Sequence, residues 1–192
     1  SQMDNVVKYL CIVDSNSLVF LYMPFYGGGS LLFHMRRLKT LSEDICKKIV
    51  SQLAYAIDAI HRDKRLVLDL RPEQILMDER GVPHIAIATS VKFRTADPPG
   101  KRVFKGSLAY FSPELVRGEA IGPAHDYWSL GILLYEMLYG PTPFDCEDVA
   151  KSRYFIENLE LKFPDRQEVS ESTKNILSRL LMTKHFSFKK TL

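Results

Sequence analysis

The chain has 192 residues, of which 46% are apolar and 26% are charged, and its formal net charge is +3. This length suits one domain, and the composition supports a buried core and excludes a largely disordered chain. The positive charge is too weak to indicate nucleic-acid binding, which needs a concentrated basic patch.

Two apolar segments rich in β-branched residues, 6–13 and 18–23, open the chain, and turn-forming residues 14–17 separate them. This pattern predicts a β-hairpin. Residues 26–30 follow and contain three consecutive glycines. Their spacing matches neither a P-loop nor a dinucleotide-binding motif, so we interpret them as a flexible hinge.

Two helices are predicted next. Ser30 is expected to cap a short helix over residues 31–38. Thr40 and Glu43 have the spacing of a capping box, in which each side chain bonds a backbone amide of the first turn. Apolar residues then recur at helical intervals over residues 45–60, and the width of this stripe predicts a deeply buried helix.

The rest of the chain alternates short strands, a polar loop and helices. In chain order, we expect strands at 66–70, 75–77 and 84–88, a loop at 96–105, an apolar helix at 128–138 that ends at the GPTP motif, and a last helix from about Ser170. The longest apolar run is too short to span a bilayer. The three cysteines have no disulfide or zinc-binding spacing, so we expect an intracellular protein, cytoplasmic or nuclear.

Four stretches of sequence carry a resemblance to a known family. LVLDLRPEQIL (66–76) is similar to the catalytic loop of protein kinases, whose pattern is H-R-D-L-x-x-x-N. GSLAYFSPE (106–114) resembles the segment that ends in A-P-E. DYWSLG, YEML and PTPF (within 126–144) resemble the central buried helix and its exit. In this order, the stretches resemble a protein kinase large lobe, most like the group of cyclic-AMP-dependent and ribosomal-S6 kinases.

The resemblance implies a mainly α fold with short β hairpins, in which the large lobe is present and the small lobe is largely absent. Residues 1–25 would be the last strands of the small lobe and the hinge, and residues 26–192 would be the helical large lobe. It also implies weak contacts to a nucleotide, made by Met23, Pro24, Tyr26 and Leu76.

The positions that hold magnesium in this family are changed. Gln74 stands where the catalytic loop has Asn, and Ile87 stands where the family has the Asp of D-F-G. Magnesium requires oxygen ligands, which isoleucine cannot supply. Between Gly81 and Pro113 the only acidic residue is Asp97, which lies well inside the polar loop. We therefore expect no metal site and no cofactor.

Other positions of the resemblance concern catalysis and its control. Asp69 is kept at the position of the base, and we interpret it mainly as a residue that shapes the loop; Ser107 could bond to it. Arg71 replaces the catalytic-loop Lys and stays cationic. Leu68 replaces the Arg that pairs with a loop phosphate, and Val103 stands at the phosphorylated position, so this switch is expected to be lost.

Two acidic residues of the resemblance have expected structural roles. Asp126 is placed to tie the backbone of the catalytic loop to the central helix. Glu114 pairs in the family with an Arg, but Phe188 stands at that position. Because an unpaired buried carboxylate is costly, we expect Glu114 to find another partner, either Arg179 or Lys189.

Three hypotheses of function follow. The first is a catalytically inactive pseudokinase that acts as a scaffold or allosteric regulator of a signalling protein, such as an active kinase or a kinase substrate. The second is a Ser/Thr kinase that uses ATP and Mg²⁺ with unusual metal ligation and a small lobe outside this chain. The third is a protein-interaction module without nucleotide binding, which Pro24 favours because proline has no N–H to donate. We prefer them in the order first, third, second.

Overall fold

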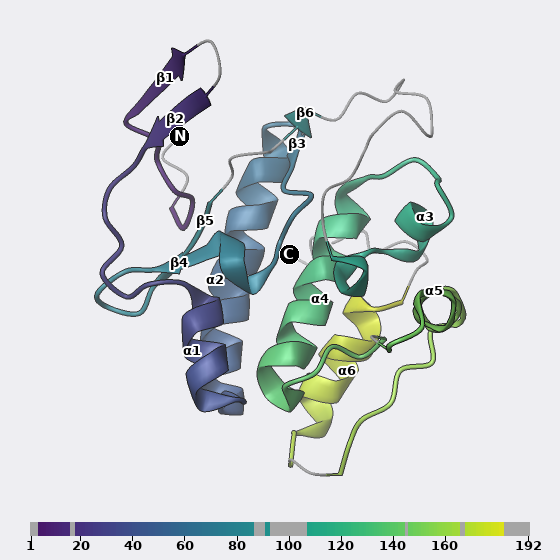
Figure 1. The fold of residues 1–192 in the computed structure, drawn as a ribbon. Helices are drawn as coiled ribbons and strands as arrows, with labels where there is room; N and C mark the ends of the chain where they lie inside the picture. The colour runs from purple at the N-terminus through teal and green to yellow at the C-terminus, as the bar shows by residue number, and fades with distance from the viewer. Residues whose placement is uncertain are drawn as a thin grey trace.

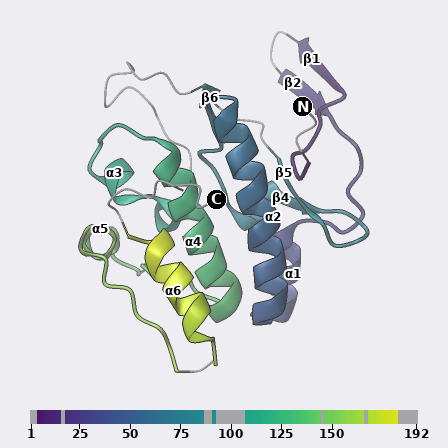
Figure 2. The ribbon, with the colours of Figure 1, turned by 180° about the vertical axis from the view of Figure 1, so that it is seen from behind.

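The computed structural model describes residues 4–15, 18–86, 91–92, 107–144, 146–165 and 168–182, and only the backbone of residues 91–92. Two long helices, α2 (Glu43–Arg62) and α4 (Pro123–Tyr139), lie side by side at its centre (Figure 1). α6 (Glu171–Leu180) packs on α4, and α1 (Leu31–Leu38) lies beside α2, as the view from behind also shows (Figure 2). The predicted fold class, mainly α with short antiparallel strand pairs, is confirmed.

The predicted hairpin is present, but it begins later than expected. β1 (Cys11–Ser15) pairs antiparallel with β2 (Leu18–Tyr22), with Cys11 opposite Tyr22. Val6 lies outside this hairpin because it forms a bridge with Ile85. Both strands are exposed along their whole length, and the hairpin projects away from the helical body (Figure 1).

The glycine segment that was predicted to be a flexible hinge is held against β4 (Ile75–Met77). Gly28 donates its N–H to the carbonyl of Met77 at 3.0 Å, and Met77 donates to the carbonyl of Gly29 at 2.8 Å. These bonds leave no room for a side chain at Gly28, whose added Cβ would lie 2.7 Å from the Met77 carbonyl oxygen. Contacts with a distant strand therefore fix this segment.

The two predicted N-terminal helices are confirmed, but one of their predicted caps is wrong. Ser30 caps α1 and accepts the N–H of Phe33. The N-cap of α2 is Ser42 rather than Thr40, and its side chain makes no capping bond. The capping box fails because the Glu43 carboxylate has other partners. It accepts the N–H of Ser170 at 2.9 Å and hydrogen bonds from Lys47 and from two hydroxyls at the start of α6.

The Glu43 contacts give an expected dependence of stability on pH. The pKa of Glu43 is lowered because Lys47, Ser170 and Thr173 donate hydrogen bonds to its carboxylate. Since the pKa in the unfolded chain is about 4.3, the stabilisation is complete above about pH 4.3 and is lost as the pH falls toward the folded-state pKa. The loss in urea midpoint caused by Glu43→Gln should therefore be larger at about pH 7 than at about pH 3.

The matched control is Glu171→Gln on the same helix that Glu43 contacts. The Glu171 side chain is 89% exposed and pairs only with Lys174 among the described residues. This variant should change the midpoint little at either pH, because exposed ion pairs contribute little. A Glu43→Gln effect that is equal at both pH values would contradict the assignment.

The short strands around the catalytic-loop sequence are shorter than predicted. β3 (Arg65–Leu66) pairs with β6 (Val91–Lys92), and β4 pairs with β5 (Pro83–Ile85). The prediction of a strand over residues 66–70 is wrong beyond Leu66, because the chain turns there into the loop described below. Residues 87–88, the end of the third predicted strand, lie outside the described residues.

The C-terminal part of the described chain consists of α4, α6 and two shorter helices. The predicted apolar helix is α4, which begins five residues earlier than expected and ends at Gly140. Ser170 caps α6 as predicted, although Ile176 faces solvent while Leu177 is buried. Two helices were not predicted: α3 (Pro113–Val116) and α5 (Val149–Asn158), which contact each other.

The structure also describes the state of the cysteines and the character of the helices. The three cysteines are free, and burial raises the pKa of Cys46 to about 12, which keeps its thiol protonated and unreactive. In the segments that the structure describes, no helix has the length and apolar character to cross a membrane.

Candidate functional site

The catalytic-loop sequence forms an extended turn between β3 and β4. Leu66, Val67 and Leu70 are buried in the core, and they alternate with residues that face outward. Asp69 and Arg71 are therefore presented at the surface, with side chains about one fifth exposed (21% and 23%). The spacing of apolar residues in this loop thus explains which side chains are available to a ligand.

Asp69 and Arg71 bind each other. Arg71 Nε lies 2.5 Å from Asp69 Oδ1, and Arg71 Nη2 lies 2.9 Å from Asp69 Oδ2. Such a two-point contact is the strongest geometry available to an Arg–carboxylate pair. It raises the pKa of Arg71, mainly because the guanidinium donates to Asp69. Each oxygen of the Asp69 carboxylate accepts one hydrogen bond from Arg71. No hydrogen bond joins Ser107 to Asp69, both of which are described.

Gln74 lies at the end of a short 3₁₀ helix (Pro72–Gln74) and is half-buried. Its backbone carbonyl accepts the N–H of Ala86 at 2.8 Å. This bond places Ala86, which directly precedes Ile87 in the chain, next to Gln74. Ile87 itself lies outside the described residues, as do Asp97, Val103, Phe188 and Lys189.

The residues whose positions are described contain no group of three His, Cys, Asp or Glu side chains that could hold a metal ion. Magnesium at nucleotide sites usually needs only one or two protein oxygen ligands besides phosphates and waters, so the absence of such a group does not test the expectation. The absence of a metal site beside Gln74 stays a prediction.

The four residues proposed to contact a nucleotide lie at the hinge and on β4. Met23 and Pro24 are exposed, and Leu76 is half-buried. Tyr26 packs on His84, with ring centroids 4.9 Å apart. Nothing in these contacts tests nucleotide binding, which stays a prediction for all four positions.

Asp126 forms the contact predicted for it. It is fully buried, and its carboxylate accepts the amides of Val67 and Leu68 at 2.9 Å each. Its Oδ2 also lies 2.7 Å from His61 Nε2 on α2. Asp126 therefore joins the catalytic loop to both central helices.

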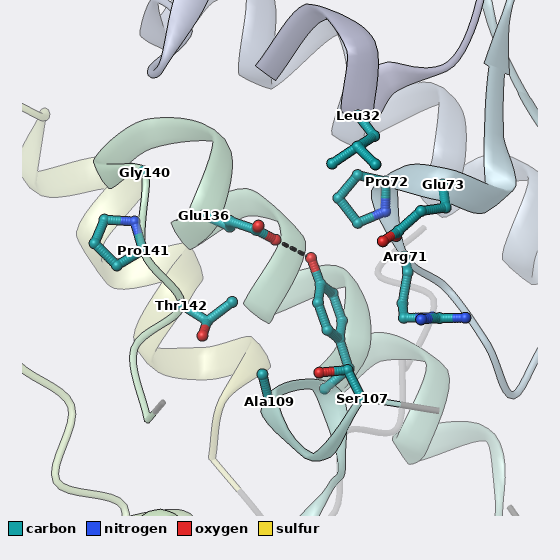
Figure 3. A pocket seen from close by; sticks show the side chains of 11 residues that line it. Leu32, Arg71, Pro72, Glu73, Ser107, Ala109, Glu136, Gly140, Pro141 and Thr142 are labelled. Carbon is teal, nitrogen blue, oxygen red and sulfur yellow. Dashed lines mark hydrogen bonds between the residues drawn. The ribbon is translucent and has the colours of Figure 1, made fainter. Parts of the chain in front are cut away.

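Beside the loop lies a cavity of about 250 Å³, which Figure 3 shows from close by. One wall comes from the catalytic loop, with Arg71, Pro72 and Glu73. The opposite wall comes from residues 107–110, the end of α4 and the turn that follows it. The complete lining is Leu32, Arg71, Pro72, Glu73, Ser107, Ala109, Tyr110, Glu136, Gly140, Pro141 and Thr142.

The cavity is acidic. Arg71 is its only cationic lining residue and is paired with Asp69, whereas Glu73 and Glu136 are carboxylates. The Tyr110 hydroxyl donates a hydrogen bond to Glu136, and burial together with this carboxylate raises the pKa of Tyr110 (Figure 3). Thr142 also lines the cavity; its Oγ1 is buried and has no hydrogen-bond partner among the described residues.

Sequence reasoning missed the role of Glu136 and Thr142. Glu136 is the only charged residue in the apolar stretch 128–138. Because charged residues are rarely buried without a partner, a single charge in an apolar helix indicates that its side chain pairs with another group or faces a cavity. No comparable signal marks Thr142, because its environment depends on how the turn after α4 folds.

A family comparison decides what this arrangement belongs to. Residues 1–187 match the family model of the protein kinase domain. The chain belongs to the protein kinase family.

Several protein kinases are similar to this kinase domain. Protein kinase 2 of Dictyostelium discoideum is 38% identical over 166 residues, which cover 85% of this chain and 33% of that protein. Serine/threonine-protein kinase MRCK beta of Homo sapiens is 33% identical over 183 residues, which cover 89% of this chain and 10% of that protein. MRCK alpha of Homo sapiens matches to the same extent. This chain therefore spans a third or less of the length of these relatives.

Proposed function

We propose that this kinase domain is a catalytically inactive, intracellular binding domain, and that its acidic cavity holds a basic segment of a protein partner. The observation that carries the proposal is the two-point pair between Asp69 and Arg71. Phosphoryl transfer depends on metal ions to neutralise charge and on a residue that positions the attacking hydroxyl. Here the residue at the base position is engaged on both oxygens, and Gln74 replaces a metal ligand.

The cavity supports a binding role. Glu73 is exposed at its edge, and Glu136 lies on its inner wall. A guanidinium fits such a site, because its planar fork of donors can bond carboxylate oxygens at two points. An extended peptide that contains arginine is therefore the partner chemistry that we propose.

Ser/Thr kinase activity with ATP and Mg²⁺ is the second candidate function. The observation that favours it is Asp69 itself, which is kept at the base position and remains partly exposed. Under this alternative, Arg71 would have to release Asp69 when substrate binds.

One experiment with two arms tests the proposal. In the first arm, the purified chain with Mg²⁺ and ATP should transfer no more phosphate to itself or to a basic peptide than its Asp69→Ala variant does. In the second arm, an arginine-containing peptide should bind the wild-type chain, and Glu73→Gln should weaken binding about fivefold, the size expected for one partly exposed ion pair. Calorimetry or fluorescence anisotropy measures this affinity.

The control for the second arm is Glu79→Gln. Glu79 is also exposed, but it does not line this cavity. Its replacement should leave peptide affinity unchanged. Phosphate transfer that Asp69→Ala abolishes would establish the second candidate instead, and equal losses from both glutamate variants would show that the peptide binds elsewhere.

A further inference from the structure

Two consecutive buried residues of α4 hold the backbone of Leu68. Asp126 Oδ1 accepts the Leu68 N–H at 2.9 Å, and His125 Nε2 lies 3.2 Å from the Leu68 carbonyl oxygen. Leu68 has a φ of 65°, in the left-handed region that residues with a side chain rarely adopt. Both polar backbone groups of a strained residue are thus held by one turn of one helix.

Donor and acceptor chemistry assigns the tautomer of His125. A carbonyl oxygen only accepts hydrogen bonds, so Nε2 must carry the hydrogen that faces Leu68. In a neutral imidazole, Nδ1 is then an acceptor, and the Ser112 hydroxyl donates to it at 2.9 Å. His125 is 1% exposed and Ser112 is fully buried, so water does not compete for these bonds.

The link joins two parts of the chain that form opposite walls of the acidic cavity. Leu68 directly precedes Asp69 in the catalytic loop. Ser112 follows the short 3₁₀ helix (Leu108–Tyr110) of the other wall and directly precedes α3. The side chain of Leu68 is apolar and cannot make an ionic contact to the opposite wall. Its backbone carbonyl is instead connected to Ser112 through the ring of His125.

We propose that His125, as the neutral Nε2–H tautomer, is a positioning residue that locks the catalytic loop to the segment before α3. The three groups of this link, Ser112, His125 and the Leu68 backbone, are paired with one another. The lock holds the loop whether or not the domain transfers phosphate or binds a peptide, so it is independent of the function proposed above.

The first test uses the wild-type chain with ¹⁵N-labelled histidine. Correlation of ring nitrogens with ring protons by NMR distinguishes the two neutral tautomers and the imidazolium form. The signals of His125, assigned by their loss in His125→Gln, should show Nε2–H at neutral pH. Observation of the Nδ1–H tautomer or of the imidazolium form would overturn the proposal.

The second test uses three variants and hydrogen exchange of the amides of residues 66–70. His125→Gln keeps a donor near the Nε2 position, His125→Asn places its shorter amide near Nδ1 without a donor at the Nε2 position, and His125→Leu keeps no polar group. Exchange should be about tenfold faster in the Asn and Leu variants, the factor expected for one lost hydrogen bond, and Gln should restore most of the protection.

The exchange of α6 separates loosening of the loop from general unfolding. Protection of residues 171–180 should be unchanged if only the lock is lost. A residue that merely fills space would give the opposite order, with Leu protected and Gln not, and this order would overturn the proposal. If every variant unfolds, the His125 signals are assigned by sequential assignment of the uniformly labelled wild-type chain, and the tautomer found there decides the proposal.

Discussion

Replacing Asp126 with alanine is expected to lower the free energy of unfolding by about 3–5 kcal/mol, the range for breaking a buried charged contact. The fully buried carboxylate accepts two backbone amides and contacts His61. Without it, the amides of Val67 and Leu68 lose their partners, and each buried unsatisfied group costs about 1–3 kcal/mol. Asp126→Asn should be milder, because the amide oxygen can still accept one of the two bonds.

Urea unfolding followed by tryptophan fluorescence measures this effect. The single tryptophan, Trp128, is buried two residues further along the same helix and will report the loss of the core. The matched control is Asp148→Ala. Asp148 is an exposed N-cap that accepts the N–H of Ala150, and its loss should cost only about 1 kcal/mol. Equal midpoints for the two alanine variants would contradict the assigned role of Asp126.

Gly28→Ala is expected to destabilise the chain by about 1–3 kcal/mol, the usual range for overfilling a packed site. A Cβ at Gly28 would lie 2.6 Å from the Asp78 carbonyl oxygen and 2.7 Å from that of Met77. These are backbone atoms of β4 and of the turn after it, so they cannot move aside cheaply. The Gly28–Met77 hydrogen bond must lengthen or break to make room.

Gly27→Ala is the matched control at the neighbouring position. There the nearest atom to an added Cβ is Cγ of the Glu79 side chain, at 2.9 Å, which can rotate away into solvent. The change in free energy of unfolding should stay within about 0.5 kcal/mol. The comparison uses urea midpoints, and the explanation fails if the two substitutions have equal effects.

Local features of the sequence predicted the helices well. Ser30 and Ser170 stand before apolar repeats, and both cap helices in the structure. The Thr40–Glu43 prediction was wrong although its spacing was correct, because Glu43 bonds Ser170, which lies 127 residues away. A capping motif shows which hydrogen bonds the Glu43 side chain is able to make. Which of them forms depends on the tertiary structure, which brings the start of α6 next to Glu43.

The site was predicted correctly where the resemblance specified a contact between a helix side chain and the backbone of the catalytic loop. The bond from Asp126 to the catalytic loop is of this kind, and it is confirmed. The Ser107–Asp69 contact was not found, and Asp69 binds Arg71 instead. The acidic cavity was not predicted at all, because Glu73 and Glu136 come together only when α4 packs beside the catalytic loop.

The sequence by itself determined where α1, α2, α4 and α6 lie and which chemical groups stand at the positions of the family motifs. Periodicity, caps and residue identity are local properties, so the replacement of a metal ligand by Gln74 and of a loop cation by Leu68 can be read without coordinates. Only the tertiary structure decided which donors meet which acceptors. The Asp69–Arg71 pair, the Glu43 contacts and the Ser112–His125–Leu68 link each depend on distances that folding sets, because a hydrogen bond forms only with a partner within about 3 Å.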